Sequence, residues 1–101
     1  MDSFNQKVWN LAKKIPKGKV TTYKLIAEKL GTKAYRAVGN GLNKNPYAPV
    51  VPCHRVVGSD GALTGYAHGL KKKSVILKHE GIIIRKNKIK DLQGVLFKYR
   101  R

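Results

Sequence analysis

The stretch TYKLIAEKLGTKAYRAVGNGLNK, residues 22–44, predicts two short helices joined by a tight glycine turn. The first helix starts at Thr22 and ends at Gly31, a residue type that commonly follows the last helical turn. The apolar residues of both helices recur at helical spacing: Leu25, Ile26, Leu30, Val38 and Leu42. Two helices in this arrangement form a helix-turn-helix, in which residues 34–44 are the recognition helix.

Two further helices are predicted on either side of this unit. SFNQKVWNLAKKIP starts at Ser3, a good N-cap, and Pro16 ends it. LKKKSVILKHEG, residues 70–81, predicts a helix with Gly81 as its C-cap. In the first of these helices the residues that recur at helical spacing are Phe4, Val8, Leu11 and Ile15. In the second, the residues expected to lie largely inward are Leu70, Val75, Ile76 and Leu77.

The other segments favour turns and extended backbone. Three prolines between residues 46 and 52 break the helical pattern, and GSDG at residues 58–61 is turn sequence. Residues 82–101 are rich in lysine and arginine and predict a short basic hairpin or a tail. The expected fold class is therefore mainly α with a small β component, a winged helix-turn-helix-like single domain over residues 1–101.

The charge of the chain points to a polyanionic partner. Its 22 lysine and arginine residues and 5 aspartate and glutamate residues give a formal net charge of +17. Such a charge opposes compactness unless a polyanion neutralises it, so nucleic acid is the leading partner and an anionic membrane surface the alternative. No apolar run reaches the length of a membrane span. The single cysteine excludes an internal disulfide, argues against a cysteine-based zinc site and suits a reducing cytosol.

Residues 51–58, VPCHRVVG, hold this cysteine. A lone cysteine is most often a small buried hydrophobe. Here Pro52 stiffens the backbone just before Cys53, and His54 can serve as a base. Arg55 and the net positive charge of the chain favour the thiolate. The pKa of an unperturbed cysteine thiol is about 8.5. Neighbouring side chains in an extended segment point to opposite faces, so Cys53 and His54 cooperate only if the backbone turns sharply or a water bridges them. A catalytic and a structural cysteine both stay open.

Six motifs occur in order around the cysteine: VTTYKLIAEKLG, RAVGNGL, NP, PCHRVV, GYAHGL and KHEG. Together they resemble the O6-alkylguanine-DNA alkyltransferases, also called methylated-DNA–protein-cysteine methyltransferases, over residues 4–81. The resemblance implies direct and irreversible transfer of an alkyl group from O6-alkylguanine in double-stranded DNA to the protein's own cysteine. It also implies a cytoplasmic monomer that acts once and needs no metal or organic cofactor.

The resemblance implies catalytic roles for five residues. Cys53 would be the acceptor thiolate, and His54 would act as its base through a bridging water. Glu80 would orient the imidazole. Asn45 would be the hinge that ties the recognition helix to the active-site loop by hydrogen bonds. Tyr66 would help hold the base and would protonate or hydrogen-bond its purine edge.

Other residues are implied in DNA binding and in the substrate pocket. Tyr23 would contact the phosphate beside the flipped nucleotide, and Arg36 would enter the base stack where the guanine left it. The further DNA-binding residues are Thr22, Lys33, Ala37 and Gly41. The pocket, formed around the active-site loop at residues 45–69, would be lined by Val56, Gly65, Tyr66, Arg55, Lys73 and His68. Without the resemblance, Arg36 and Lys73 are solvated cations and Tyr23 is an ordinary packed ring.

Three departures from the family pattern bear on activity. Many relatives carry an additional N-terminal domain, whereas we expect this chain to comprise the active-site and DNA-binding domain alone. His68 stands at the pocket rim where relatives often have glycine, which bears on the tolerance of bulky adducts. The alternative function is a non-catalytic lesion sensor or basic DNA-binding protein of the alkyltransferase-like type. Such proteins share the short format but lack the acceptor cysteine, so Cys53 argues for transfer.

Overall fold

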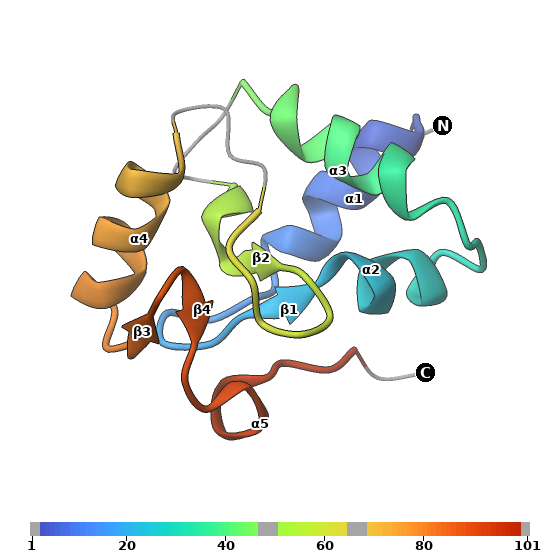
Figure 1. Ribbon diagram of the computed structural model, residues 1–101. Coiled ribbons are helices and arrows are strands. Elements are labelled where there is room, and N and C mark those ends of the chain that lie inside the picture. Colours follow the sequence, from blue (N-terminus) through green and yellow to red (C-terminus); the bar gives the residue numbers. More distant parts are fainter. Residues whose placement is uncertain (1–2, 47–50, 65–68, 100–101) are drawn as a thin grey trace.

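The computed structural model describes residues 3–46, 51–64 and 69–99. Helices dominate, and the strands are short (Figure 1). The elements follow the chain in the order α1 (Phe4–Ala12), β1 (Thr21–Thr22), α2 (Tyr23–Lys29), α3 (Tyr35–Asn43), η1 (Cys53–Arg55), β2 (Val56–Val57), α4 (Leu70–His79), β3 (Ile84–Arg85), β4 (Lys88–Ile89) and α5 (Leu92–Val95). The expected fold class, mainly α with a small β component, is confirmed.

The predicted helix-turn-helix corresponds to α2 and α3. The Thr22 hydroxyl oxygen accepts a hydrogen bond from the Leu25 amide at 3.1 Å and so caps α2. Gly31 follows the helix in the left-handed region, with φ of 74°, as a residue after a helix end commonly does. Val38 and Leu42 are buried on the inner side of α3. The two helices and their packing face are therefore as predicted.

Helix α1 packs against α3 and fixes its position. Ser3 caps α1 as predicted, because its hydroxyl accepts from the Gln6 amide at 3.1 Å. The Trp9 indole donates to the Gly41 carbonyl at 2.8 Å. A Cβ at Gly41 would lie 2.6 Å from the side-chain oxygen of Asn5, so glycine lets the two helices approach closely at this point.

Strands β1 and β2 pair in parallel, with Thr21 opposite Val56 and Thr22 opposite Val57. The pairing places the start of the helix-turn-helix beside the residues that follow Cys53. Since β1 leads directly into α2 and η1 leads directly into β2, this short sheet fixes the cysteine turn relative to the recognition unit.

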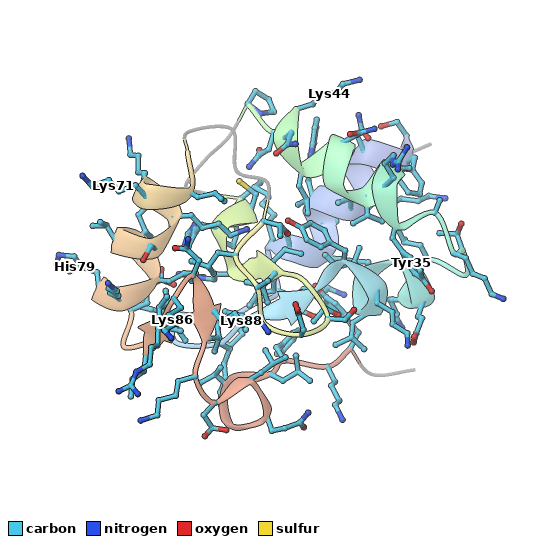
Figure 2. All side chains as sticks on the ribbon, viewed as in Figure 1. Tyr35, Lys44, Lys71, His79, Lys86 and Lys88 are labelled. Carbon is cyan, nitrogen blue, oxygen red and sulfur yellow. The ribbon has the colours of Figure 1, made fainter. Side chains whose placement is uncertain are left out.

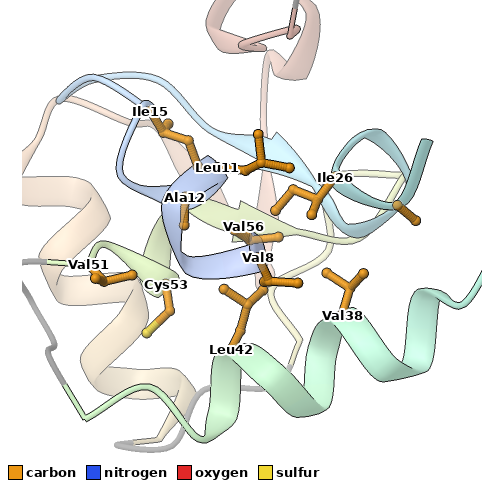
Figure 3. Packing of buried hydrophobic residues seen from close by; sticks show 11 residues of the cluster. Val8, Leu11, Ala12, Ile15, Ile26, Val38, Leu42, Val51, Cys53 and Val56 are labelled. Carbon is orange, nitrogen blue, oxygen red and sulfur yellow. The ribbon is translucent and has the colours of Figure 1, made fainter. Parts of the chain in front are cut away.

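Buried apolar side chains form two clusters. The first lies among α1, α2, α3 and η1 and comprises Val8, Leu11, Ala12, Ile15, Ile26, Ala27, Val38, Leu42, Val51, Cys53 and Val56 (Figure 3). The second cluster comprises Val20, Val57, Leu63, Leu77, Ile82 and Ile89. Strand β2 contributes one valine to each cluster, so it lies where the two meet.

Residues 82–99 fold back onto the rest of the chain. β3 and β4 form an antiparallel hairpin, whose turn residues Lys86 and Asn87 have φ of 53° and 60°. Beyond α5 the chain returns to the first cluster, where the Tyr99 hydroxyl donates to the Leu11 carbonyl at 2.8 Å. Of the hairpin and the tail considered from the sequence, the hairpin is present, and the residues after it are packed as well.

The inward face of α4 differs from the prediction. Leu77 is buried, but Leu70 and Val75 are 40% and 52% exposed. The buried face runs through Lys73 and Leu77, four residues apart, and Val75 lies about 200° around the helix from Lys73. Leu70 is the N-terminal residue of α4, where the side chain is exposed. The prediction is therefore right for Leu77, partly right for Ile76, and wrong for Leu70 and Val75. The inward position one turn before Leu77 is occupied by a lysine.

The exposed cations are distributed over several elements. Lys44 follows α3, Lys71 lies on α4 and Lys86 lies in the hairpin turn, and all three side chains point outward (Figure 2). Positive charge is therefore not confined to the recognition helix. Within the described ranges, no helix combines the length and the apolar content needed to cross a bilayer.

Candidate active site

Cys53 begins the 3-10 turn η1. Its amide donates to the Val51 carbonyl at 2.9 Å, and the Arg55 amide donates to the Pro52 carbonyl at 2.9 Å. A 3-10 turn rotates successive side chains by about 120°, so Cys53 and His54 do not point in opposite directions. The sharply turned backbone considered from the sequence is therefore present. Cys53 is 6% exposed, and its sulfur lies at the edge of the first cluster (Figure 3).

His54 is buried next to Cys53 and is held by Glu80. Its Nε2 lies 3.1 Å from Glu80 Oε2. Burial lowers the pKa of the imidazole below its ordinary value, although the carboxylate acts in the opposite direction. We therefore assign a ring that is neutral at pH 7, with its proton on the nitrogen that faces Glu80. Nδ1 is buried and has no hydrogen-bond partner among the described residues, so its lone pair can accept a proton.

Arg55 holds Glu80 in place. Its Nε and Nη2 donate to the two carboxylate oxygens at 2.9 and 2.6 Å, and Nη1 donates to the Ile15 carbonyl at 2.8 Å. Burial acts to raise the pKa of Glu80, but the hydrogen bonds from Arg55 and His54 outweigh it and the pKa is lowered. Glu80 is therefore ionised at neutral pH. The guanidinium of Arg55, predicted to favour the thiolate, is engaged with Glu80.

The pKa of Cys53 is raised, which corrects the expectation of a thiol with a lowered pKa. Burial is the largest cause, and the hydrogen bond from Asn45 and the charge of Lys73 lower the pKa by smaller amounts. A thiol with a raised pKa is mostly protonated at pH 7. It becomes a nucleophile when a nearby base takes its proton, and His54 is the adjacent base.

Asn45 and Lys73 complete the surroundings of the thiol. The Asn45 side-chain amide donates to the Val51 carbonyl at 2.8 Å and so connects the end of α3 to η1. Lys73 is fully buried on α4, and its Nζ donates to the carbonyls of Val56 at 2.7 Å and Thr64 at 2.9 Å. Burial lowers the pKa of Lys73 to about 8. The alternative of a solvated cation at Lys73 is therefore wrong.

A surface groove of about 350 Å³ lies beside these residues. It is lined by Tyr23, Tyr35, Arg36, Gly39, Asn40, Asn43 and Thr64. The Tyr23 hydroxyl donates to the Thr64 carbonyl at 2.7 Å, and burial raises the pKa of Tyr23, so the hydroxyl keeps its proton. Arg36 is exposed on α3. The groove and the thiol surroundings thus meet at Thr64, which contacts both Tyr23 and Lys73.

The remaining predicted site residues occupy different environments. Thr22 caps α2, and Gly41 is buried in the contact between α1 and α3, so both have structural roles in the fold. Lys33 is exposed before α3, and Ala37 is half-buried on that helix. Outside the described residues lie Gly65, Tyr66 and His68.

Part of the groove was not predicted from the sequence. Tyr35, Gly39 and Asn43 follow one another at four-residue intervals and so share a face of α3. That spacing is the signal that could have identified them. Thr64 takes part through its backbone carbonyl, for which the residue type gives no signal. In the part of the chain that the structure describes, no three His, Cys, Asp or Glu side chains gather as metal ligands would.

The family model described as the DNA-binding domain of 6-O-methylguanine DNA methyltransferase matches residues 3–82. The chain belongs to this family. The methylated-DNA–protein-cysteine methyltransferase of Methanosarcina acetivorans is 54% identical over 79 residues, which are 77% of this chain and 51% of the relative. The protein of the same name from Shigella flexneri is 46% identical over 82 residues, 80% of this chain and 48% of the relative. The chain spans about half the length of these curated relatives.

Solved structures of similar proteins include complexes with DNA. Mycobacterium tuberculosis OGT in complex with DNA is 43% identical, with a TM-score of 0.75, over 79% of this chain and 50% of that chain. S. pombe Atl1, in complex with damaged DNA containing O6-carboxymethylguanine, is 31% identical, with a TM-score of 0.85, over 98% of both chains. The likeness to Atl1 therefore extends beyond the residues that the 6-O-methylguanine DNA methyltransferase model matches.

Asn45→Ala is expected to raise the pKa of Cys53 further, because the hydrogen bond from this amide lowers it in the wild type. The midpoint of Cys53 alkylation by iodoacetamide should then move to higher pH, which intact-mass measurement across a pH series detects. Asn43→Ala removes an exposed amide two residues earlier and serves as the control, with no expected shift. If the two variants gave the same midpoint, the Asn45 amide would have no effect on the thiol.

Proposed function

We propose that this chain repairs O6-alkylguanine in double-stranded DNA by transferring the alkyl group to its own Cys53. One observation carries the proposal: a buried thiol stands beside a neutral His54 whose Nδ1 has no partner among the described residues and whose Nε2 is held by Glu80. Membership of the 6-O-methylguanine DNA methyltransferase family supports it, as do the names of the curated relatives.

In the proposed step, the thiol proton passes to His54 Nδ1 through a bridging water, and the ionised Glu80 stabilises the imidazolium that forms. The sulfur attacks the alkyl carbon, so that a sulfur–carbon bond forms as the bond from carbon to O6 breaks. The electron pair of the broken bond stays with guanine, which takes up one proton in place of the one the thiol lost. The products are unmodified guanine and a thioether at Cys53, so each molecule acts once.

The proposed substrate pocket lies around the thiol. Lys73 would place a positive charge beside the sulfur while the thiolate forms, and the Val56 backbone would line the pocket. Asn45 would keep the thiol turn in register with α3. Three residues outside the described ranges belong to the same proposal. Gly65 and Tyr66 would line the pocket, with Tyr66 as the proton donor to the purine, and His68 would stand at the rim.

Double-stranded DNA is the proposed partner, and the groove on α3 is the proposed contact. An alkyl group on O6 is out of reach inside the duplex, so the nucleotide must leave the stack at a cost of a few kcal/mol. Tyr23 would contact the phosphate beside it and Arg36 would fill the vacated place. Lys33 and Ala37 would contact the backbone nearby. The charge of +17 supplies affinity that is independent of sequence. On this proposal the chain acts as a monomer in the compartment that holds the DNA.

A second candidate is a lesion binder that transfers nothing. It is favoured by one comparison, because Atl1 in complex with damaged DNA matches 98% of both chains. Cys53 favours transfer instead, as does His54 Nδ1, which has no hydrogen-bond partner in the described ranges, since a binder has no use for a thiol beside a base.

Intact-mass measurement after mixing with a duplex that contains O6-methylguanine separates the two functions. Transfer adds one methyl group per protein molecule at Cys53, and the amount reaches a plateau at an equal ratio. Cys53→Ser should bind the duplex as before and gain no mass, since the groove is unchanged. An unmodified wild-type protein, or methylation of the Cys53→Ser variant, would contradict the proposal.

Arg36→Ala should slow transfer from duplex DNA by about tenfold or more, which corresponds to about 1.4 kcal/mol of lost transition-state stabilisation. Reaction with free O6-benzylguanine should be unaffected, because no base stack is present to be held open. Lys33→Ala removes an exposed cation just before α3 and is the control for charge alone. Equal defects on both substrates would place Arg36 in the chemistry or the fold, and equal effects of the two variants would reduce it to a surface cation.

A further inference from the structure

The hairpin β3–β4 forms a backbone junction with residues 58–64, here called the 58–64 loop. The Leu63 amide donates to the Asn87 carbonyl at 2.8 Å, and the Ile89 amide donates to the Gly61 carbonyl at 3.0 Å. Both bonds run between chain segments more than twenty residues apart. Such bonds fix the loop relative to the hairpin whatever side chains the loop carries.

A further backbone pairing and one buried side chain reinforce this junction. Ala62 and Lys88 form an antiparallel β-bridge between the two backbone bonds. The Leu63 side chain is buried with Ile89 in the second cluster. The Lys88 amine also lies 3.5 Å from the Asp60 carboxylate, but both side chains are exposed, and such a pair contributes little. Backbone pairing and the burial of Leu63 are therefore what hold the loop.

The 58–64 loop ends at Thr64, whose carbonyl belongs to the candidate site. That carbonyl accepts hydrogen bonds from the Tyr23 hydroxyl at 2.7 Å and from Lys73 Nζ at 2.9 Å. Leu63 immediately precedes Thr64, so the bond that holds the Leu63 amide also limits where the Thr64 carbonyl can lie. The Tyr23 hydroxyl and the Lys73 amine, which both have roles in the proposed function, therefore depend on the hydrogen bond between the hairpin and Leu63.

We propose that the hairpin β3–β4 is a positioning element for the site. By holding Leu63, it sets the Thr64 carbonyl, and through that carbonyl it sets the Tyr23 hydroxyl and the Lys73 amine. The inference rests on the proposed function of those two groups. The hairpin follows residue 82, where the match to the family model ends, so the C-terminal segment of this chain is assigned a part in the reaction.

The location of the hairpin favours this role over a direct grip on DNA. In Figure 1 the hairpin lies across the molecule from α3, and the segment after β2 lies between it and α2. Its route to the groove is therefore the 58–64 loop. Its turn has exposed Lys86 and Asn87 in the left-handed region, so the turn can be altered there without removing a buried side chain.

The sharpest test compares two substitutions at Asn87. Proline fixes φ near −65° and cannot adopt the value of 60° found there, so Asn87→Pro should displace the carbonyl that holds Leu63. Glycine accepts positive φ without strain, so Asn87→Gly is the matched control. At saturating O6-methylguanine duplex, Asn87→Pro should slow transfer by about tenfold to a hundredfold, because a small displacement of positioning groups has effects of this size. Asn87→Gly should match the wild type.

A second pair reaches the same junction from the loop. The Gly61 carbonyl accepts from the Ile89 amide, and Gly61 has φ of 86°, a backbone conformation that alanine rarely adopts. Gly61→Ala should therefore strain the backbone within the junction and open it, although its Cβ would make only ordinary contacts with Ile89. Gly31→Ala carries similar backbone strain at φ of 74° with no atom within 4 Å, and serves as its control. If Asn87→Pro fails to fold, Gly61→Ala decides the question.

Amide hydrogen exchange and DNA affinity give the readouts that a merely structural role would not produce. The Leu63 amide should lose protection in Asn87→Pro and Gly61→Ala, while the Val38 amide in α3 and the affinity for unmodified duplex stay at wild-type values. An exposed Leu63 amide with wild-type transfer would overturn the proposal. So would loss of Val38 protection in both variants, since the hairpin would then support the whole domain.

Failure of the proposed function is a separate result. If the wild type binds methylated duplex but gains no mass, transfer is wrong, and the preference for methylated over unmodified duplex becomes the readout. Loss of that preference in Asn87→Pro and not in Asn87→Gly would still support the positioning role. An unchanged preference, with the Leu63 amide exposed, would overturn it.

Discussion

The Glu80 carboxylate accepts hydrogen bonds from both His54 and Arg55, and the candidate site depends on this sharing. A buried carboxylate is costly unless a charged partner and further hydrogen bonds compensate it. Arg55 supplies them, and its third contact, with the Ile15 carbonyl, extends the connection to the segment after α1. One carboxylate at the end of α4 thereby fixes the turn that carries the thiol and leaves one nitrogen of His54 without a partner among the described residues.

This arrangement decides which of the neighbouring groups carries a proton at rest. Burial raises the pKa of the Cys53 thiol and lowers that of the His54 imidazole. The thiol therefore holds its proton at rest, and the base beside it is neutral and able to take that proton. The positive charge of Lys73 acts in favour of the thiolate. The groove on α3 is connected to the same site through Thr64, whose carbonyl accepts from both the Tyr23 hydroxyl and the Lys73 amine.

The sequence predicted the helices correctly because helix ends depend on residues that are close together in the chain. Caps at Ser3 and Thr22 and the glycine after α2 identified the helices because these signals act within one turn. The resemblance also predicted that Glu80 lies next to the His54 imidazole, and the two side chains are in contact. Long-range contacts decided the rest: Lys73 is buried because two carbonyls from distant segments accept its protons, and a run of three lysines carries no sign of that. The hydrogen-bond partners of Arg55 could not be predicted from the sequence either, since they lie 25 and 40 residues away along the chain.

The nitrogen-15 chemical shifts of the His54 ring, followed from acid to neutral pH, show directly whether His54 can take the proton of Cys53. We expect a neutral ring at pH 7 that carries its proton on Nε2 and has a pKa below the ordinary value of 6.5. Its Nδ1 would then be the nitrogen that accepts the thiol proton. A ring that is charged at pH 7, or a neutral ring with its proton on Nδ1, could not act as the base for Cys53 and would rule out this role.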